Sequence, residues 1–388
     1  MANPPQDFEV QVAADEEPQD DTRSEMGSSI ASSSTSLRSS LVDYRRENGR
    51  TYHRYKDGKY NFPNDERELD RLGTFRCHFA TYLIFKLTSA VDLVHHLCLL
   101  TLDDRLGIAP PCREDAKVGR VLDVGTGTGI WAIHFGDDHP EADILGVDLS
   151  ATQPGHVPPN VRFEVDDIED EWTFSQPFQY IHSRFMTSSI GDWKLFLQRC
   201  YDNLEPGGYV ELQETAIFAK SDDGTLKPEH ALYKWAEYLM EASIKLGAAW
   251  VDTPELRQLM VDIGFEDVVL STYKWPTNPW PKDPHFKELG MWNNENFMTG
   301  MEAIAMAPMT RALEWLPEEV RVFLIDVRKD GNDRNIHAYW PQHILVGRKP
   351  KREAPAPAPE ASPAPASPPA PAPASAPAPA AAPAPAAA

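Results

Sequence analysis

The feature that most constrains the fold is a glycine-rich turn directly after a short apolar run. The stretch VLDVGTGTGIWAI covers residues 121–133, and its first four residues predict a buried parallel strand. Residues 130–135 have helical patterning, and ILGV at 144–147 predicts a second strand that ends at Asp148. Glycines let a chain turn tightly and let a ligand reach backbone N–H groups at a helix N-terminus. The stretch therefore predicts a β-α-β unit that binds a nucleotide cofactor.

Two cofactors fit this turn. For NAD, Gly127, Gly129 and Ala132 align with the dinucleotide fingerprint, and Asp148 lies about 20 residues on, where it suits a ribose. Asp123 favours S-adenosylmethionine instead, because a carboxylate repels a pyrophosphate but can pair with the ammonium of a cationic cofactor, directly or through water. A buried aspartate that only caps the turn is the alternative. A P-loop is excluded, because no Gly-Lys-Ser/Thr follows.

The predicted strands that follow also end in polar residues. VRFEVDDIEDEW (161–172) predicts a strand ending in acids, where Asp167 suits an adenine amino group, Asp166 competes with it, and Ile168 suits the ring. A solvated acidic surface is the alternative. FQYIHSR (178–184) and YVELQE (209–214) predict two more strands, and open α/β sheets bind ligands at the carboxyl ends of their strands. The predicted cofactor-binding residues are Asp123, Gly125, Thr126, Gly127, Gly129, Asp148, Leu149, Asp166, Asp167 and Ile168.

Charge and composition limit the classes of partner. The 388 residues carry a formal net charge of −22, with 59 acids against 37 bases. Nucleic-acid binding needs clustered Lys and Arg, so we expect no direct contact with nucleic acid. The basic cluster RKPKR (348–352) is either a solubilising end to the last strand or a nuclear import signal. The acidic, Ser-rich residues 1–40 and the Ala/Pro-rich residues 351–388 are predicted to be disordered.

Cysteine spacing and hydropathy exclude further classes. The four cysteines form no C-x-x-C pair and no Cys/His set with zinc spacing, so we predict no metal site. The longest apolar run, residues 79–91, is shorter than the ~20 residues that a membrane span needs. The polar, acidic N-terminus does not resemble a signal peptide. We expect a cytoplasmic protein, with the nucleus as the alternative.

Four motifs in order resemble class I S-adenosylmethionine-dependent methyltransferases: LDVGTGTG, VDLS, the turn EPGG and the strand YVELQE. The stretches GRTYHRYKDGKYNFPNDERELDRL (49–72), IHSRFMTSSIGDW (181–193), YKWPTNPWPKD (273–283) and ILVGRKP (344–350) are similar to the fungal LaeA-like methyltransferases. This resemblance implies a Rossmann-like α/β fold with a seven-stranded sheet whose last strand is antiparallel. It also implies a segment with Tyr52, Tyr55 and Tyr60 that folds over the cofactor pocket.

The resemblance sets the expected domain organisation. Residues 41–110 form an N-terminal lid and helical segment, and residues 111–350 form the methyltransferase domain with a helical cap at about 284–335. The sequence departs from the LaeA-like pattern at three places. Thr126 replaces the usual cysteine of the glycine turn, Gln179 replaces an aspartate, and residues 73–91 are a candidate insertion before a helix with His95 and His96.

Methyl transfer requires alignment more than acid–base groups, because the cofactor's leaving group is already activated. No catalytic triad is expected. His182, at the end of a strand, is the preferred general base, and a histidine that only hydrogen-bonds backbone and shapes the loop is the alternative. Arg184, which suits an acidic or carbonyl substrate, and Glu214 are second-line catalytic candidates. The aromatic- and Met-rich segment 271–339 is expected to wall the acceptor pocket, with ordinary core packing as the alternative.

Three functions remain open from the sequence. The first is a methyltransferase that acts on a small fungal metabolite, which Thr126 and the aromatic segment favour. The second is a LaeA-like regulator that works in a nuclear complex with protein partners, which the disordered ends and the basic cluster favour. The third is an NAD-dependent oxidoreductase.

Overall fold

The computed structural model describes residues 8–9, 12–13, 45–52, 63–64 and 93–351. The candidate insertion at 73–91, Tyr55 and Tyr60 of the expected lid, and the tail from residue 352 lie outside the described residues. All of the described residues belong to one unit, Met1–Lys351. None of the helices in these ranges has both the length and the apolar character needed to cross a bilayer.

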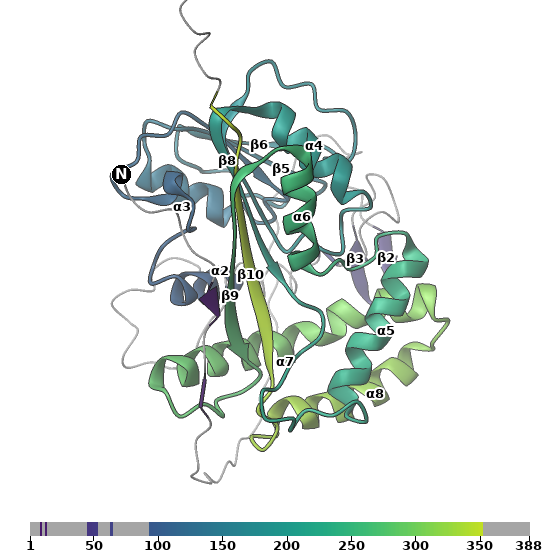
Figure 1. Ribbon diagram of the computed structural model, residues 1–388. Helices are drawn as coiled ribbons and strands as arrows, with labels where there is room; N and C mark the ends of the chain where they lie inside the picture. Colours follow the sequence, from purple (N-terminus) through teal and green to yellow (C-terminus); the bar gives the residue numbers. More distant parts are fainter. Residues whose placement is uncertain (1–7, 10–11, 14–44, 53–62, 65–92, 352–388) are drawn as a thin grey trace, which may run out of the picture. The chain divides into compact units, whose positions relative to one another are not determined.

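A mixed sheet of seven strands confirms the expected fold class. Its order is β6–β5–β4–β7–β8–β10–β9, and β10 runs antiparallel to both of its neighbours, whereas β4 to β8 are mutually parallel (Figure 1). The strands are β4 Arg120–Val124, β5 Asp143–Asp148, β6 Val161–Val165, β7 Phe178–Arg184, β8 Leu204–Thr215, β9 Glu266–Pro276 and β10 Tyr339–Arg348. The reversal of strand order between β4 and β7 creates a topological switch point, which is where such sheets bind ligands.

A short eighth strand lies at the edge of the sheet, beside β9. It is β1 (Phe8–Glu9), from the segment 1–40 for which disorder was expected, and it pairs parallel with Ser271 and Thr272 of β9. The carbonyl of Ala13 accepts a hydrogen bond from the Lys282 backbone N–H at 2.9 Å. An acidic composition does not prevent a few residues from adding to an exposed sheet edge, because that pairing uses only backbone groups.

Both faces of the sheet are covered by helices, which explains why the central strands β4 and β5 are buried almost throughout. Neighbouring side chains on a strand point to opposite faces. Leu122 therefore packs with α4 (Trp193–Asn203) and α6 (Thr253–Ile263), whereas Val121 packs with α3 (Ile130–Asp138). The shorter helices α2 (Leu93–Thr101) and η1 (Pro110–Cys112) precede β4.

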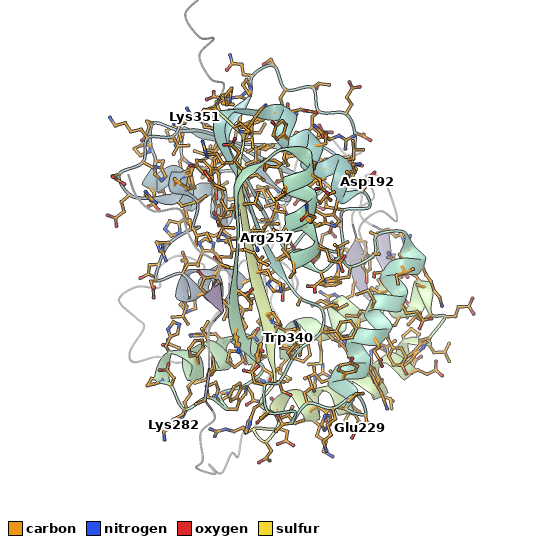
Figure 2. The ribbon with its side chains drawn as sticks, viewed as in Figure 1. Asp192, Glu229, Arg257, Lys282, Trp340 and Lys351 are labelled. Atoms are coloured by element: carbon orange, nitrogen blue, oxygen red, sulfur yellow. The ribbon has the colours of Figure 1, made fainter. Side chains whose placement is uncertain are left out.

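Three helices form the cap, and one of them, α5, lies outside the range of about 284–335 expected from the sequence. They are α5 (Ala231–Leu246), α7 (Pro284–Ala312) and α8 (Pro317–Asn332), which pack against one another (Figure 1). Their shared apolar core contains Trp235, Phe297, Met301 and Leu324. Trp340 of β10, labelled in Figure 2, also belongs to this core. Its ring centroid lies 4.6 Å from that of Phe297. The cap is thus a small helical bundle built on the end of the antiparallel part of the sheet.

A hairpin from the N-terminal segment is attached to this cap. Strands β2 (Arg45–Glu47) and β3 (Arg50–Tyr52) are joined by Asn48 and Gly49, both with positive φ, as in a tight hairpin turn. Arg311, near the end of α7, donates to Glu47 at 2.7 Å and lies over the Tyr52 ring at 4.7 Å. Tyr52 is buried, so the hairpin packs on the domain rather than projecting from it.

Candidate functional site

A cavity lies at the carboxyl ends of the parallel strands. Its walls come from the glycine turn after β4, the ends of β5 and β7, the loop after β6, the start of α2 and residues 63–64. All of the predicted cofactor-binding residues except Gly129 line it, and so do the predicted catalytic residues His182 and Arg184. Strand topology alone brings these distant parts of the sequence to one sheet edge.

Positive φ angles at Gly125, Gly127 and Gly129 shape the turn. At Gly127 no atom lies within 4 Å of where a Cβ would stand, so the backbone faces open space. At Gly129 a Cβ would stand 2.4 Å from the Phe163 ring, which explains why a glycine is needed there although it does not line the cavity. Gly129 instead caps the N-terminus of α3.

Asp148, at the end of β5, fixes the shape of this turn. One of its carboxylate oxygens accepts from the Gly127 backbone N–H and the other from the Ser150 backbone N–H, both at 2.9 Å. Burial raises the pKa of Asp148, while these backbone donors oppose the rise. The side chain still lines the cavity. A change at Asp148 would therefore alter both the wall of the site and the conformation of the glycine turn.

Asp123 and His182 form a buried pair between β4 and β7. The two residues are register partners, and His182 Nδ1 lies 2.7 Å from Asp123 Oδ1. The other oxygen of Asp123 accepts from the Thr126 hydroxyl at 2.6 Å. A carboxylate can only accept, so His182 carries its proton on Nδ1. The indole of Trp131 stacks on the imidazole with ring centroids 3.7 Å apart.

His182, which lines the cavity, has one ring nitrogen without a hydrogen-bond partner in the described part of the chain. Nε2 is buried and has no hydrogen-bond partner among the described residues, and with the proton on Nδ1 it presents a lone pair. Burial lowers the pKa of His182, and the hydrogen bond that Nδ1 donates to Asp123 only partly opposes this effect. His182 therefore does not hydrogen-bond backbone to shape the loop. It is a neutral acceptor, held by a carboxylate and a stacked indole.

Arg184 is held by neutral acceptors. It donates through Nε to Gln213 Oε1 at 2.6 Å, through Nη1 to His95 Nδ1 at 3.1 Å and through Nη2 to the Leu106 carbonyl at 3.1 Å. Within the described part of the chain it has no ion pair with a carboxylate, although it lines the cavity. Its positive charge is therefore available to a ligand.

His95, whose role the sequence left undecided, supports Arg184. Because Arg184 donates to Nδ1, the His95 proton must sit on Nε2, which lies 3.1 Å from His134 Nδ1. Burial is the largest cause that holds the pKa of His95 well below its usual value, and the positive charge of Arg184 is the second. Only the tertiary structure shows that this helix, and not only the strand ends, borders the cavity.

Glu214 does not reach the cavity. Its carboxyl accepts from the backbone N–H groups of Met186 and Thr187 at 3.0 and 3.1 Å, and burial raises its pKa to about 8. It lines a separate small cavity, together with Tyr273 and Trp275. Glu214 thus positions the loop that contains Met186, and it does not line the cavity of Asp123 and His182.

The two acids after β6 are distinguished by burial. Asp167 is 2% exposed and accepts from the Glu169 backbone N–H at 2.9 Å, whereas Asp166 is exposed, and both line the cavity. Asp167 is thus a buried residue and not part of a solvated acidic surface, and its contact with an adenine stays a prediction. The expected acceptor wall from residues 271–339 is absent from this cavity, among the described residues. Met301, Met306 and Met309 are instead core residues of the cap.

Three features together define a class I methyltransferase. They are the strand order, the antiparallel strand β10 and the glycine turn that follows β4 at the switch point. A family model described as a methyltransferase domain matches residues 95–270. "Methyltransferase pytC" of Aspergillus terreus is 40% identical over 350 residues, which cover 90% of this chain and 98% of that protein. "Secondary metabolism regulator LAE1" of Cochliobolus heterostrophus is 36% identical, covering 79% and 95% of the two chains. "Probable methyltransferase tdiE" of Emericella nidulans is 34% identical, covering 68% and 82%. The chain belongs to this methyltransferase family, within its LaeA-like group.

Proposed function

We propose that this protein transfers a methyl group from S-adenosylmethionine to a small-molecule acceptor. The observation that carries the proposal is the charge of the cavity. Among the described lining residues, Arg184 is the one lysine or arginine. Five acids line the same cavity: Asp123, Asp148, Asp166, Asp167 and Glu169. Such a wall attracts a sulfonium donor and repels a pyrophosphate. Membership of a methyltransferase family likewise argues against the NAD alternative.

The residues present fit this cofactor. The open space at Gly127 leaves room for a ligand against the backbone. The family resemblance assigns the ribose to Asp148 and the adenine to Asp167 and Ile168, with Leu149 beside them, and all four line the cavity. When bound, S-adenosylmethionine supplies an activated methyl group on a cationic sulfur. The protein aligns the acceptor and excludes water, which can supply ~7–11 kcal/mol.

His182 is the proposed general base for a hydroxyl or amine acceptor. His182 lines the cavity and its Nε2 has no hydrogen-bond partner among the described residues, so in this proposal Nε2 takes the acceptor's proton, and the Asp123 carboxylate then stabilises the imidazolium. Arg184 is proposed to orient an anionic or carbonyl group of the acceptor, since its charge is not neutralised by a carboxylate of the described chain. Glu214 acts only by holding the loop of Met186.

A regulatory role is the second candidate, and its support comes from the relatives. LAE1 is named a secondary metabolism regulator and is nearly as similar to this chain as the methyltransferase pytC. In this case the output would be assembly with protein partners in the nucleus rather than turnover of a metabolite. The enzymatic role, in the cytoplasm, is preferred because the cavity retains both an unpaired base and an unneutralised cation.

The test is to incubate the purified protein with S-adenosylmethionine labelled in its methyl group and with extracts of a strain that lacks the gene. A labelled small molecule is the expected product, and a His182→Gln variant should reduce its rate of formation without loss of cofactor binding. Normal binding of S-adenosylhomocysteine, with no labelled metabolite but stable co-purification with nuclear proteins, would support the regulator. Stabilisation by NADH but not by S-adenosylhomocysteine would contradict both candidates.

A further inference from the structure

Asn64 reaches the cavity from the N-terminal segment, far from the glycine turn in sequence. Its backbone N–H donates to the carbonyl of Thr51 at 2.8 Å, which ties it to strand β3 of the hairpin. The hairpin is in turn fixed to the cap by the contact between Glu47 and Arg311. Pro63 and Asn64 both line the cavity. Asn64 therefore has a defined position in the wall.

The carboxamide of Asn64 is buried without partners. The residue is 9% exposed, and within the described structure neither Oδ1 nor Nδ2 has a hydrogen-bond partner. Buried polar side-chain atoms are nearly always paired, so an amide with both ends unpaired needs an explanation. Two other buried asparagines of the described chain each have a partner for Nδ2: Asn278 donates to the Gly331 carbonyl at 3.1 Å, although its Oδ1 has no partner, and Asn293 donates to the Pro276 carbonyl at 2.9 Å. A ligand in the cavity would satisfy Asn64.

The chemistry of the cavity selects the ligand group. A carboxamide donates through Nδ2 and accepts through Oδ1, so it suits a group that contains both an acceptor and a donor. An α-amino carboxylate is such a group. Its carboxylate would be repelled by the acids that line the strand ends, such as Asp123 and Asp148. A neutral amide, with the guanidinium of Arg184 on the same cavity, offers donors without that repulsion.

We propose that Asn64 binds the α-amino carboxylate end of S-adenosylmethionine, with Nδ2 donating to the carboxylate and Oδ1 accepting from the ammonium. The assignment rests on the proposed function, and it makes the N-terminal segment part of the cofactor site. Asn64 becomes a ligand-binding residue rather than a hinge or a spacer of the segment.

The test uses calorimetry on the full-length chain with two probes. S-adenosylhomocysteine has the α-amino carboxylate, whereas 5′-methylthioadenosine has the nucleoside but lacks that end. The variants are Asn64→Leu, which removes both hydrogen-bonding atoms at similar volume, and Asn64→Asp, which replaces the donor by a carboxylate. Gln176→Glu is the control for added charge, because Gln176 is exposed and does not line the cavity.

Both Asn64 variants should weaken S-adenosylhomocysteine binding by about 10-fold or more while leaving methylthioadenosine affinity within about 2-fold. Gln176→Glu should change neither. Equal losses for the two probes, or no loss for either, would overturn the assignment of Asn64. If the unsubstituted protein bound neither probe, the proposed cofactor itself would fail, and that result is distinct from a defect seen only in the variants.

Discussion

The Asp123 carboxylate and the His182 imidazole are joined by a buried 2.7 Å contact across two neighbouring strands. The sequence suggested that Asp123 meets the cofactor's ammonium. In the structure each of its oxygens already accepts a hydrogen bond, one from His182 and one from Thr126. Asp123 therefore determines which nitrogen of His182 is left without a hydrogen-bond partner in the described structure. Thr126, which departs from the LaeA-like pattern, has a defined partner in this arrangement.

The first prediction concerns the pH dependence of the reaction. The neutral form of His182 is needed if it accepts a proton, and its pKa is lowered below 6.5 by burial. The rate of methyl transfer should thus be level through neutrality and fall only on the acid side, at a pH below the ordinary histidine pKa of 6.5. His182→Gln should lower kcat by ~10²–10⁴-fold and abolish this acid limb. Kinetics from pH 5 to 8 check both results.

A control variant separates the base from the residue that orients it. Asp123→Asn leaves the side-chain volume unchanged but removes the negative charge that favours the imidazolium, so the acid limb should move to lower pH while kcat falls. An unchanged pH profile in both variants would show that His182 does not exchange a proton during turnover.

The second prediction concerns Asp148. Asp148→Ala removes a wall of the cavity and frees the Gly127 backbone N–H, so the affinity for S-adenosylhomocysteine should fall by roughly 1–3 kcal/mol. Asp148→Asn is the matched variant: it retains an oxygen for one backbone donor and should lose less. Titration calorimetry measures both. Unaltered affinity in the alanine variant would remove Asp148 from the site.

Residues at strand ends could be placed from the sequence because a parallel sheet brings every carboxyl end to one edge. That rule located Asp123, Asp148 and Asp167. The rule does not tell which face of the sheet a strand-end side chain occupies. Glu214 was therefore expected in the site, although its carboxyl binds the backbone of Met186 and does not line the cavity. Asn64 carries no comparable signal, because its place in the wall depends on tertiary contacts of the hairpin.

The cap shows a second limit of sequence reasoning. Methionine and aromatic side chains suit both a ligand pocket and a packed core, so composition alone could not decide between them. Met301 and Met306 pack inside the bundle of α5, α7 and α8, whereas Met186, outside the segment expected to form the acceptor wall, lines the cavity. The expected cap range of about 284–335 contains α7 and α8, but not their packing partner α5, because packing between helices distant in sequence is a tertiary feature.

The third prediction concerns stability at alkaline pH. The pKa of Glu214 is about 8 in the folded chain, against 4.5 for an ordinary glutamate. Between these values the folded state binds the proton that the unfolded state has lost, so the free energy of unfolding falls as pH rises through this window. Glu214→Gln should remove that part of the slope, which amounts to a few kcal/mol at about 1.4 kcal/mol per pKa unit.

Urea unfolding at pH 6 and pH 9 measures this effect. The unsubstituted chain should lose more stability between the two pH values than the Glu214→Gln variant loses. Glu205→Gln, at a partly exposed position in the same strand, is the control and should leave the slope unaltered. Parallel slopes for all three chains would contradict a proton on Glu214 at neutral pH.

The last prediction links the hairpin to the cavity through Arg311. Arg311→Met keeps most of the side-chain volume but removes the donors to Glu47 and the charge over Tyr52. Because the pair is partly buried, the substitution should destabilise the hairpin by about 1–2 kcal/mol and raise amide exchange at residues 45–52. Asn64 is hydrogen-bonded to the hairpin through the Thr51 carbonyl, so the affinity for S-adenosylhomocysteine should fall when the hairpin is destabilised. Arg321→Met, which removes a more exposed ion pair with Glu302 on the same cap, should leave affinity and exchange unchanged. Faster exchange without weaker binding would uncouple the hairpin from the cofactor.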